Sequence, residues 1–394
     1  MALSRSAYIH IPFCRHRCGY CNFTLVAGRD DLTGDFLTAI DLEIQRSLKS
    51  QTSELDTLFL GGGTPSHLSP SDLSRLFDVL HRHFSLSKDA EFSCEVNPLD
   101  CTAEKLELMR LAGVNRVSVG GQSFQQRKLH RLQRDHSGSQ LHDAMQRTQQ
   151  SVSNVSLDLI FAAPGESLAE WSADLDAAIA LAPQHISTYG LTVERGSAFY
   201  GQVQRGQIRE INEELQLAMY ESAIDRLTDA GMQHYEVSSF ARPGFECRHN
   251  STYWSGASWH AIGPGAASFI NSVRAVNHRS TTTYIRRVMA GQSPVAESEQ
   301  LTPEQTLRER LVFGLRRLAG VDLEELSAIW RSDCEPLFQP YLTEYLENGW
   351  LSRTGDQIRL TRRGLVISDS LWPALLAMSY RATESNQNST CLQY

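Results

Sequence analysis

Short apolar or β-branched segments alternate with helical patterns over the first two thirds of the chain. Six of these segments have the length of strands and end in turn residues, namely 7–11, 57–60, 91–96, 116–120, 155–161 and 185–191. Helical patterns lie between them at 35–49, 71–83, 102–111 and 168–181. Strands that alternate with helices predict a parallel sheet with right-handed crossover connections.

Six such units favour an α/β fold built as a partial (β/α)6 barrel, similar to a TIM barrel, over a closed barrel of eight strands. An open doubly wound sheet is the competing arrangement. In both folds the chemistry gathers at the carboxyl ends of the strands. Cysteines follow the first predicted strand, a glycine run follows the second, and polar side chains lie near the ends of the others. We therefore expect one site at this end of the sheet.

The pattern changes in the last third of the chain. Residues 236–300 are rich in glycine, histidine and aromatic side chains and are expected to connect two domains. Helices are predicted at 304–318, 323–331 and 336–348, followed by two short strands around a Gly-Asp turn and a helix from Arg362. The predicted parts are a barrel over 1–235, a connecting segment over 236–300, a small helical or winged-helix-like domain over 301–380, and a mobile tail over 381–394.

Composition narrows the class of protein. The chain has 394 residues, of which 41% are hydrophobic and 21% charged, as in ordinary globular proteins. It contains no apolar run near the roughly 20 residues that cross a bilayer, and its start is too short for a signal peptide. We therefore expect a cytoplasmic protein. The net charge of −8, and the nine arginines against ten acidic residues over 301–364, argue against a nucleic-acid partner.

Three cysteines, Cys14, Cys18 and Cys21, are spaced C-x3-C-x2-C directly after the first predicted strand. Thiolates select soft metals, and iron–sulfur clusters are held by cysteine sulfur. Three ligands leave one iron of a 4Fe-4S cluster open for a small molecule. A structural zinc site is the alternative, although it commonly needs four ligands and no second close cysteine pair follows. Disulfides are disfavoured because eight cysteines are few for this length.

The second signal is the run Gly61-Gly62-Gly63-Thr64-Pro65 after the second predicted strand. Consecutive glycines allow backbone to approach a ligand closely, although a tight turn is the simpler explanation. The run lacks the Gly-Lys-Ser/Thr of a phosphate-binding loop and the spacing of a dinucleotide-binding loop. Its position beside the cysteine segment favours a binding role.

Together these motifs resemble the radical S-adenosylmethionine superfamily, and more narrowly the oxygen-independent coproporphyrinogen III oxidase family. The similarity runs over nearly the whole chain and is carried by the stretches YIHIPFC at 8–14, GGGTP at 61–65, EVNP at 95–98, RVSVGGQSF at 116–124 and LDLI at 157–160. The resemblance implies a 4Fe-4S cluster on the three cysteines and S-adenosylmethionine on the open iron. It also implies the residues around that cofactor: Tyr8, Tyr20, Gly62, Gly63, Thr64, Glu95, Gln122, Arg134, Asp158 and Gly190.

Residue chemistry agrees with several of these assignments. Arg134 would pair with a carboxylate, and Glu95 and Asp158 would accept hydrogen bonds from ribose hydroxyls. Both acids stand in apolar strands, where an unpaired carboxylate would be costly. The alternative for Arg134 is a surface position paired with Asp135.

Two activities compete within the family: oxidative decarboxylation of coproporphyrinogen propionates, and haem binding and delivery by a haem-chaperone branch. The oxidase has a fourth cysteine two residues after the third, where this chain has Phe23, and a long segment before its first strand, where this chain has seven residues before Tyr8. Both departures put the decarboxylase activity in doubt. A radical enzyme acting on tRNA is disfavoured by the acidic balance.

The string His249-Asn250-Ser251-Thr252-Tyr253-Trp254 resembles the H-N-x-x-Y-W signature of the haem-chaperone branch. An imidazole is a usual axial ligand of haem iron, and aromatic faces suit a porphyrin. The alternative is a buried core histidine beside two aromatic residues. The resemblance predicts a haem site at His249, Asn250, Tyr253 and Trp254. It also predicts three kinds of partner: a haem-acceptor protein, for which a respiratory protein is one candidate, an electron donor for the cluster, and a second copy of the chain as a candidate homodimer.

Overall fold

The computed structural model describes residues 4–48 and 54–377. Its centre is a nine-stranded sheet in the order β11-β1-β4-β5-β6-β7-β8-β10-β9. Six neighbouring parallel strands correspond to the predicted ones: β1 (Ser6–Ile11), β4 (Leu55–Gly62), β5 (Leu86–Val96), β6 (Arg116–Gln122), β7 (Asn154–Phe161) and β8 (His185–Gly190). The predicted parallel sheet is confirmed.

Three further short strands extend the sheet at its two edges. β11 (His260–Ile262) pairs parallel with β1, and β10 (Ser239–Ala241) pairs antiparallel with β8 and with β9 (Gln233–Glu236). Part of the segment expected to be connecting structure therefore belongs to the sheet. Strands of three or four residues are too short to show alternation in the sequence.

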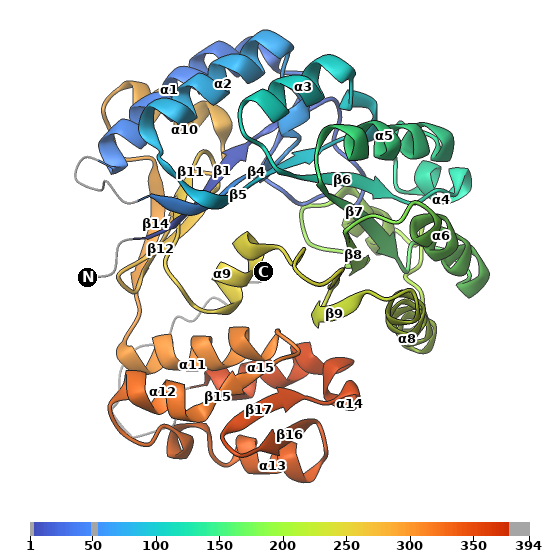
Figure 1. Ribbon diagram of the computed structural model, residues 1–394, viewed down its shortest axis with the longest axis vertical. Coiled ribbons are helices and arrows are strands. Elements are labelled where there is room, and N and C mark those ends of the chain that lie inside the picture. Colours follow the sequence, from blue (N-terminus) through green and yellow to red (C-terminus); the bar gives the residue numbers. More distant parts are fainter. Residues whose placement is uncertain (1–3, 49–53, 378–394) are drawn as a thin grey trace.

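Helices cover the outer, convex side of the curved sheet (Figure 1). They are α1 (Thr33–Ser47), α2 (Pro70–His83), α3 (Ala103–Leu111), α4 (Gln126–Arg131), α5 (Gly138–Ser151), α6 (Leu168–Ala180) and α8 (Glu213–Asp229). One covered face is the arrangement of a barrel, whereas a doubly wound sheet carries helices on both faces. The fold is therefore the predicted partial barrel, open between β9 and β11.

Alternation along the strands separates two environments. Residues such as Val117, Val119, Leu157 and Leu159 are fully buried in the hydrophobic core with the covering helices. The alternate positions face the interior of the barrel, and many are polar. Among these interior residues are Thr57, Glu91, Glu95, Arg116, Ser118, Ser156, Asp158, His185 and Ser187.

The chain then leaves the barrel and returns to it. α9 (Arg248–Trp254) lies between the barrel and the C-terminal domain (Figure 1). A separate antiparallel sheet follows, made of β12 (Ala267–Ile270), β13 (Val273–Asn277) and β14 (Val295–Gln300), and α10 (Thr281–Met289) packs against α1.

The C-terminal domain contains helices around a small sheet with the order β15-β17-β16. The predicted hairpin is present as β16 (Leu351–Thr354) and β17 (Gln357–Leu360), and the sheet is completed by β15 (Val321–Asp322). The helices are α11 (Pro303–Leu315), α12 (Leu323–Trp330), α13 (Tyr341–Glu347), α14 (Arg362–Leu365) and α15 (Ser368–Leu376).

One predicted helix, 336–348, is wrong. α13 begins only at Tyr341, after Pro340, and a 3₁₀ turn, Glu335–Phe338, precedes it. A proline inside a helix removes a backbone hydrogen bond and clashes with the preceding turn, so the helix starts after it. The predicted tail, 381–394, lies outside the described residues.

Candidate functional site

The cysteine segment forms a loop at the carboxyl end of β1. Cys14 ends β2 (Phe13–Cys14), which pairs with β3 (Val26–Ala27) and so closes the base of the loop. Arg17 holds the loop from inside by donating hydrogen bonds to the carbonyl oxygens of Cys21, Phe23 and Leu25 at 3.4, 3.1 and 2.9 Å. Sequence reasoning missed Arg17, since nothing in its spacing marks a side chain that binds the carbonyl groups of its own loop.

Polar side chains from later strand ends contact the cysteine sulfurs. The Cys14 sulfur lies 3.2 Å from the Thr64 hydroxyl, and Arg134 Nη1 lies 3.6 Å from the Cys18 sulfur. Burial raises the pKa of the Cys14 thiol to about 12 and also raises the pKa of Cys21. Thiols with raised pKa values stay protonated in the absence of metal, and metal binding would release these protons.

The donor set fits an iron–sulfur cluster better than a single ion. Across residues 4–48 and 54–377, no three His, Cys, Asp or Glu side chains are arranged to hold one metal ion. A closed zinc centre requires ligands that converge at about 2.3 Å from one ion, whereas the cysteines of a four-iron cluster bind separate irons. Cys14, Cys18 and Cys21 would hold three irons and leave the fourth open.

Close approaches explain the three glycines at the end of β4, of which Gly61 and Gly62 belong to the strand and Gly63 follows it. A Cβ on Gly61 would meet Glu95 Oε2 at 2.9 Å, one on Gly62, whose φ is +106°, would meet the His10 ring at 2.4 Å, and one on Gly63 would meet the Ile11 carbonyl oxygen at 2.7 Å. The N–H groups of Gly62 and Gly63 donate within the protein, to Glu95 at 3.1 Å and Ile11 at 2.8 Å. A ligand amino group donates, so on these two residues only the backbone carbonyl oxygens could accept from it.

Two carboxylates lie in the barrel interior below this loop. Burial, followed by the charge of Asp158, raises the pKa of Glu95 to about 7. Burial also raises the pKa of Asp158, although this carboxylate accepts hydrogen bonds from the Ser118 hydroxyl at 3.1 and 3.0 Å. Both carboxylates accept hydrogen bonds within the protein, Glu95 from the Gly62 N–H, and both keep capacity to accept from ribose hydroxyls.

Arg134 is not the surface residue that the alternative assumed. Its Nη2 donates to the Gly120 carbonyl oxygen at 2.7 Å while Nη1 faces Cys18, and Asp135 instead lies 3.8 Å from both Arg15 and His16. The buried Nε atom of Arg134 has no partner among the described residues. Its guanidinium therefore retains a donor at the edge of the site.

The remaining predicted cofactor residues lie at strand ends or beside the cysteines. Gln122 ends β6 with a left-handed φ of 65°, and Gly190 ends β8, where an added Cβ would lie 3.1 Å from Phe161. Burial raises the pKa of the Tyr20 hydroxyl, and the charge of Arg134 partly offsets this effect. The Tyr8 hydroxyl lies 3.0 Å from His10 Nδ1, and His10 Nε2 lies 2.6 Å from the Thr24 carbonyl oxygen in the cysteine loop.

His249 points into the barrel rather than toward solvent. His249 is 1% exposed. Its Nδ1 atom lies 2.8 Å from the Thr57 hydroxyl, and its Nε2 atom lies 2.7 Å from the Tyr253 hydroxyl. The ring stacks on Phe59 at a centroid distance of 5.1 Å. Burial, followed by the charge of Arg116, lowers the pKa of His249 to about 3, so the imidazole is neutral.

The rest of the H-N-x-x-Y-W segment lies on α9 between the two domains. Asn250, Tyr253 and Trp254 are half-buried. The Arg316 guanidinium lies over the Trp254 ring at 4.5 Å, which joins α9 to the C-terminal domain. The segment therefore packs between the two domains. The predicted haem site adjoins the predicted S-adenosylmethionine site through Tyr8, whose ring lies 6.4 Å from that of His249.

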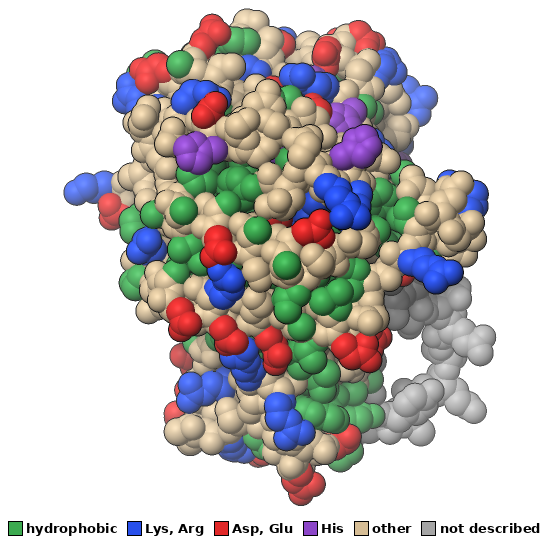
Figure 2. Space-filling view, turned by 90° about the vertical axis from the view of Figure 1, so that its right-hand side faces the viewer, with side chains coloured by type: hydrophobic (Ala, Val, Ile, Leu, Met, Phe, Trp, Pro, Cys, Tyr) green, Lys and Arg blue, Asp and Glu red, His purple; other side chains and the backbone are tan. Residues whose placement is uncertain are grey.

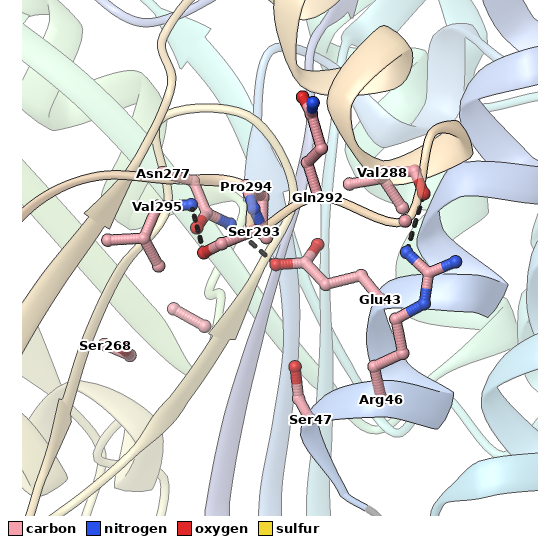
Figure 3. A pocket seen from close by; sticks show the side chains of 12 residues that line it. Glu43, Arg46, Ser47, Ser268, Asn277, Val288, Gln292, Ser293, Pro294 and Val295 are labelled. Atoms are coloured by element: carbon pink, nitrogen blue, oxygen red, sulfur yellow. Dashed lines mark hydrogen bonds between the residues drawn. The ribbon is translucent and has the colours of Figure 1, made fainter.

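A cavity of about 320 Å³ lies elsewhere, against α1 (Figure 3). Glu43 lies at its base and accepts hydrogen bonds from Asn277 Nδ2 at 2.7 Å, from the Gly263 N–H at 2.9 Å, and from the Tyr284 hydroxyl. Its lining comes from α1, α10 and the strands beside them, and includes none of the predicted site residues.

Comparison with known proteins agrees with this geometry. Residues 8–178 match the model of the radical SAM superfamily, and residues 301–367 match the model of the HemN C-terminal domain. The coproporphyrinogen III oxidase HemN from Escherichia coli has a similar fold, with a TM-score of 0.84 at 22% identity over 95% of this chain and 90% of that one.

Relatives of similar length and higher identity define the family more narrowly. "Heme chaperone HemW" of Bacillus subtilis is 33% identical over 94% of this chain and 99% of its own. The proteins of the same name from Mycobacterium tuberculosis (strain H37Rv) and Escherichia coli are 36% and 32% identical, each over 94% of this chain, and over 94% and 98% of their own lengths. The chain belongs to the HemW family of the radical SAM superfamily.

Proposed function

We propose that this protein is a haem chaperone, which binds haem and transfers it to an acceptor protein. The observation that carries the proposal is the match along almost the entire chain to relatives named as haem chaperones, 32–36% identical in bacteria. The H-N-x-x-Y-W segment supports it, since an imidazole and two aromatic faces suit haem.

The radical SAM core would hold a 4Fe-4S cluster on Cys14, Cys18 and Cys21, with S-adenosylmethionine beside it. When bound, this pair can supply a 5′-deoxyadenosyl radical. The residues of the chain have supporting tasks: carbonyl oxygens of Gly62 and Gly63 accept from the amino group, Arg134 binds the carboxylate, and Glu95 and Asp158 accept from the ribose. Thr64, Gln122, Tyr8, Tyr20 and Gly190 complete the enclosure of the nucleoside.

The haem site in this proposal consists of His249, Asn250, Tyr253 and Trp254. His249 is the iron ligand, and its neutral imidazole already has the protonation state that ligation requires.

Phe23, at the position of the oxidase's fourth cysteine, is 66% exposed. Coproporphyrinogen oxidation is the less supported alternative, because the likeness to the oxidase at 22% identity concerns the fold alone.

Partners and location complete the proposal. A haem-requiring acceptor receives the cargo, an electron donor serves the cluster, and self-association stays open. None of the described helices is long and apolar enough to cross a membrane. On the face seen in Figure 2, basic and acidic side chains are interspersed. We propose a cytoplasmic location, where the cysteines that would hold the cluster stay reduced.

The test is an anaerobic haem titration of the full-length protein with His185→Ala as matched control. His185 is also buried in the barrel, with ring nitrogens 2.8 Å from the Ser156 hydroxyl and 2.9 Å from the Tyr235 hydroxyl. We expect a saturable Soret band in the wild type and in His185→Ala, and its loss in His249→Ala. Absence of saturable haem binding by the wild type would reject the proposal.

A further inference from the structure

α9 is held in the barrel by groups that lie outside the H-N-x-x-Y-W segment. Helices as short as its seven residues are not stable on their own. The N-cap residue, Cys247, makes no side-chain capping bond. Instead the Glu91 carboxylate on β5 accepts from the backbone N–H groups of Arg248 and His249, each at 3.0 Å. A negative charge at this end also suits the helix dipole.

The His249 side chain is fixed by the neighbouring strand. Thr57 on β4 contacts Nδ1 at 2.8 Å, and Phe59 from the same strand covers one face of the ring. On the other side, the Tyr253 hydroxyl lies 2.7 Å from Nε2. A histidine that binds haem iron must direct at the metal a ring nitrogen that has no other partner. Here both ring nitrogens have partners, and the ring is too deeply buried for a porphyrin to reach them.

Glycines with positive φ flank α9 on both sides. Gly244 precedes it and Gly256 follows it, with φ values of +85° and +64°, in the region that glycine adopts most readily. An added Cβ at Gly244 would meet no atom within 4 Å, whereas one at Gly256 would meet Arg310 Cγ at 2.7 Å, so that only the Gly244 side is uncrowded. Short segments with such ends are the usual hinges of moving elements.

We infer that Thr57 and Glu91 form a latch that keeps His249 in a closed position, and that haem ligation requires α9 to leave the barrel interior. This inference rests on the proposed haem-chaperone function. A ligand that binds only the open conformation has an apparent affinity reduced by the fraction of molecules that are open. Weakening the latch therefore strengthens haem binding, although the altered residues never touch haem.

The decisive variant is Thr57→Val, which keeps the shape of the side chain and removes the hydroxyl from Nδ1. The matched control is Thr188→Val, a strand threonine of similar burial whose hydroxyl donates to Ser238 at 3.4 Å and does not contact α9. Glu91→Gln, which weakens the helix cap, is the second variant. Haem affinity, haem association rate and hydrogen exchange of the amides at 248–254 are measured for all.

We expect Thr57→Val to bind haem about 2- to 12-fold more tightly and faster, the change that corresponds to one hydrogen bond. The amides of α9 should exchange faster by a similar factor without added haem, and Glu91→Gln should change both quantities in the same direction. The latch would be overturned if Thr57→Val had the same haem affinity and the same exchange rates as Thr188→Val and the wild type. Weaker haem binding by Thr57→Val would overturn it as well. If the wild type binds no haem, the proposed function fails, whereas the exchange rates still decide whether Thr57 and Glu91 restrain α9.

Discussion

Arg134 joins the end of β6 to the cysteine loop: one end of its guanidinium donates to the Gly120 carbonyl oxygen at 2.7 Å, and the other lies 3.6 Å from the Cys18 sulfur. A positive charge beside a cluster ligand favours the more negative, reduced cluster. The same side chain is proposed to bind the carboxylate of S-adenosylmethionine. One residue thus connects the cluster to its proposed partner molecule.

We predict that Arg134→Gln lowers the reduction potential of the reconstituted cluster by on the order of 50 mV, because a nearby charge is lost. Binding of S-adenosylmethionine should weaken as well. Redox titration followed by electron paramagnetic resonance measures both effects. Arg131→Gln is the control, since Arg131 donates to Gly165 on the exposed side of the same segment. Equal potentials in the two variants would show that Arg134 does not act on the cluster.

Cysteine substitutions test which sulfurs hold the cluster. Changing Cys14, Cys18 or Cys21 to Ser should reduce bound iron and sulfide after anaerobic reconstitution to background, because each would hold a separate iron. Cys334→Ala is the control, as this buried thiol lies in the C-terminal domain beside Ser327. Zinc bound in place of iron and sulfide would contradict the cluster assignment.

Lys128 on α4 forms a buried ion triad with Glu166, in the loop after β7, and with Asp174 on α6. Its ammonium lies 2.5 Å from Glu166 and 3.0 Å from Asp174, and all three side chains are at most 1% exposed. Lys128→Met should destabilise the protein by about 3–5 kcal/mol, since it leaves two buried carboxylates without a cation. Urea denaturation measures the loss.

The control for the triad neutralises it entirely. Adding Glu166→Gln and Asp174→Asn to Lys128→Met should recover much of the lost stability, because no buried charge is left unpaired. Exposed Lys88→Met should have little effect. A triple variant as unstable as the single one would show that packing, rather than charge, causes the loss.

Glu43 predicts a pH dependence of stability. Burial raises its pKa to about 7 from the ordinary glutamate value of 4.5, although three neutral donors partly offset this effect. The folded state then holds the proton more tightly than the unfolded state, so that the contribution of Glu43 is full below pH 4.5 and is lost as pH rises toward 7.

The measurement compares the wild type with Glu43→Gln. Between pH 5 and pH 8 the wild type should lose about 1–3 kcal/mol of unfolding free energy relative to the variant. Buried neutral histidines such as His136 and His234, whose pKa values are lowered to about 4 by burial, make stability rise with pH instead. Both proteins contain these histidines, so the difference between their unfolding free energies cancels this contribution. Parallel curves for the two proteins would contradict a raised pKa of Glu43.

The elements with strong periodic patterns were predictable from the sequence. The six main strands and the helices with clear apolar faces carry local signals, and Ser or Thr caps mark the beginnings of α2 and α3. α5 was missed because its sequence, GSQLHDAMQRTQQS, is mostly polar and its buried stripe is narrow. β11 was missed because three residues cannot show a period.

The candidate site was predictable as a list of residues but not as an arrangement. The cysteine spacing and the H-N-x-x-Y-W segment are local, so the sequence reveals them. The partners of His249 are not: Thr57 and Glu91 lie 192 and 158 residues away and look like ordinary strand residues. Whether the imidazole faces solvent or the barrel depends on these distant contacts, and only the folded chain displays them.

The proposed function is that of a carrier of porphyrin rather than of an enzyme that converts it. The most direct test is an anaerobic incubation of the cluster-loaded protein with S-adenosylmethionine, a reductant and coproporphyrinogen III, followed by chromatography of the porphyrins. We predict that coproporphyrinogen is recovered unchanged and that haem, added in a parallel incubation, stays bound and is recovered intact. Formation of protoporphyrinogen with repeated turnover would contradict the carrier function.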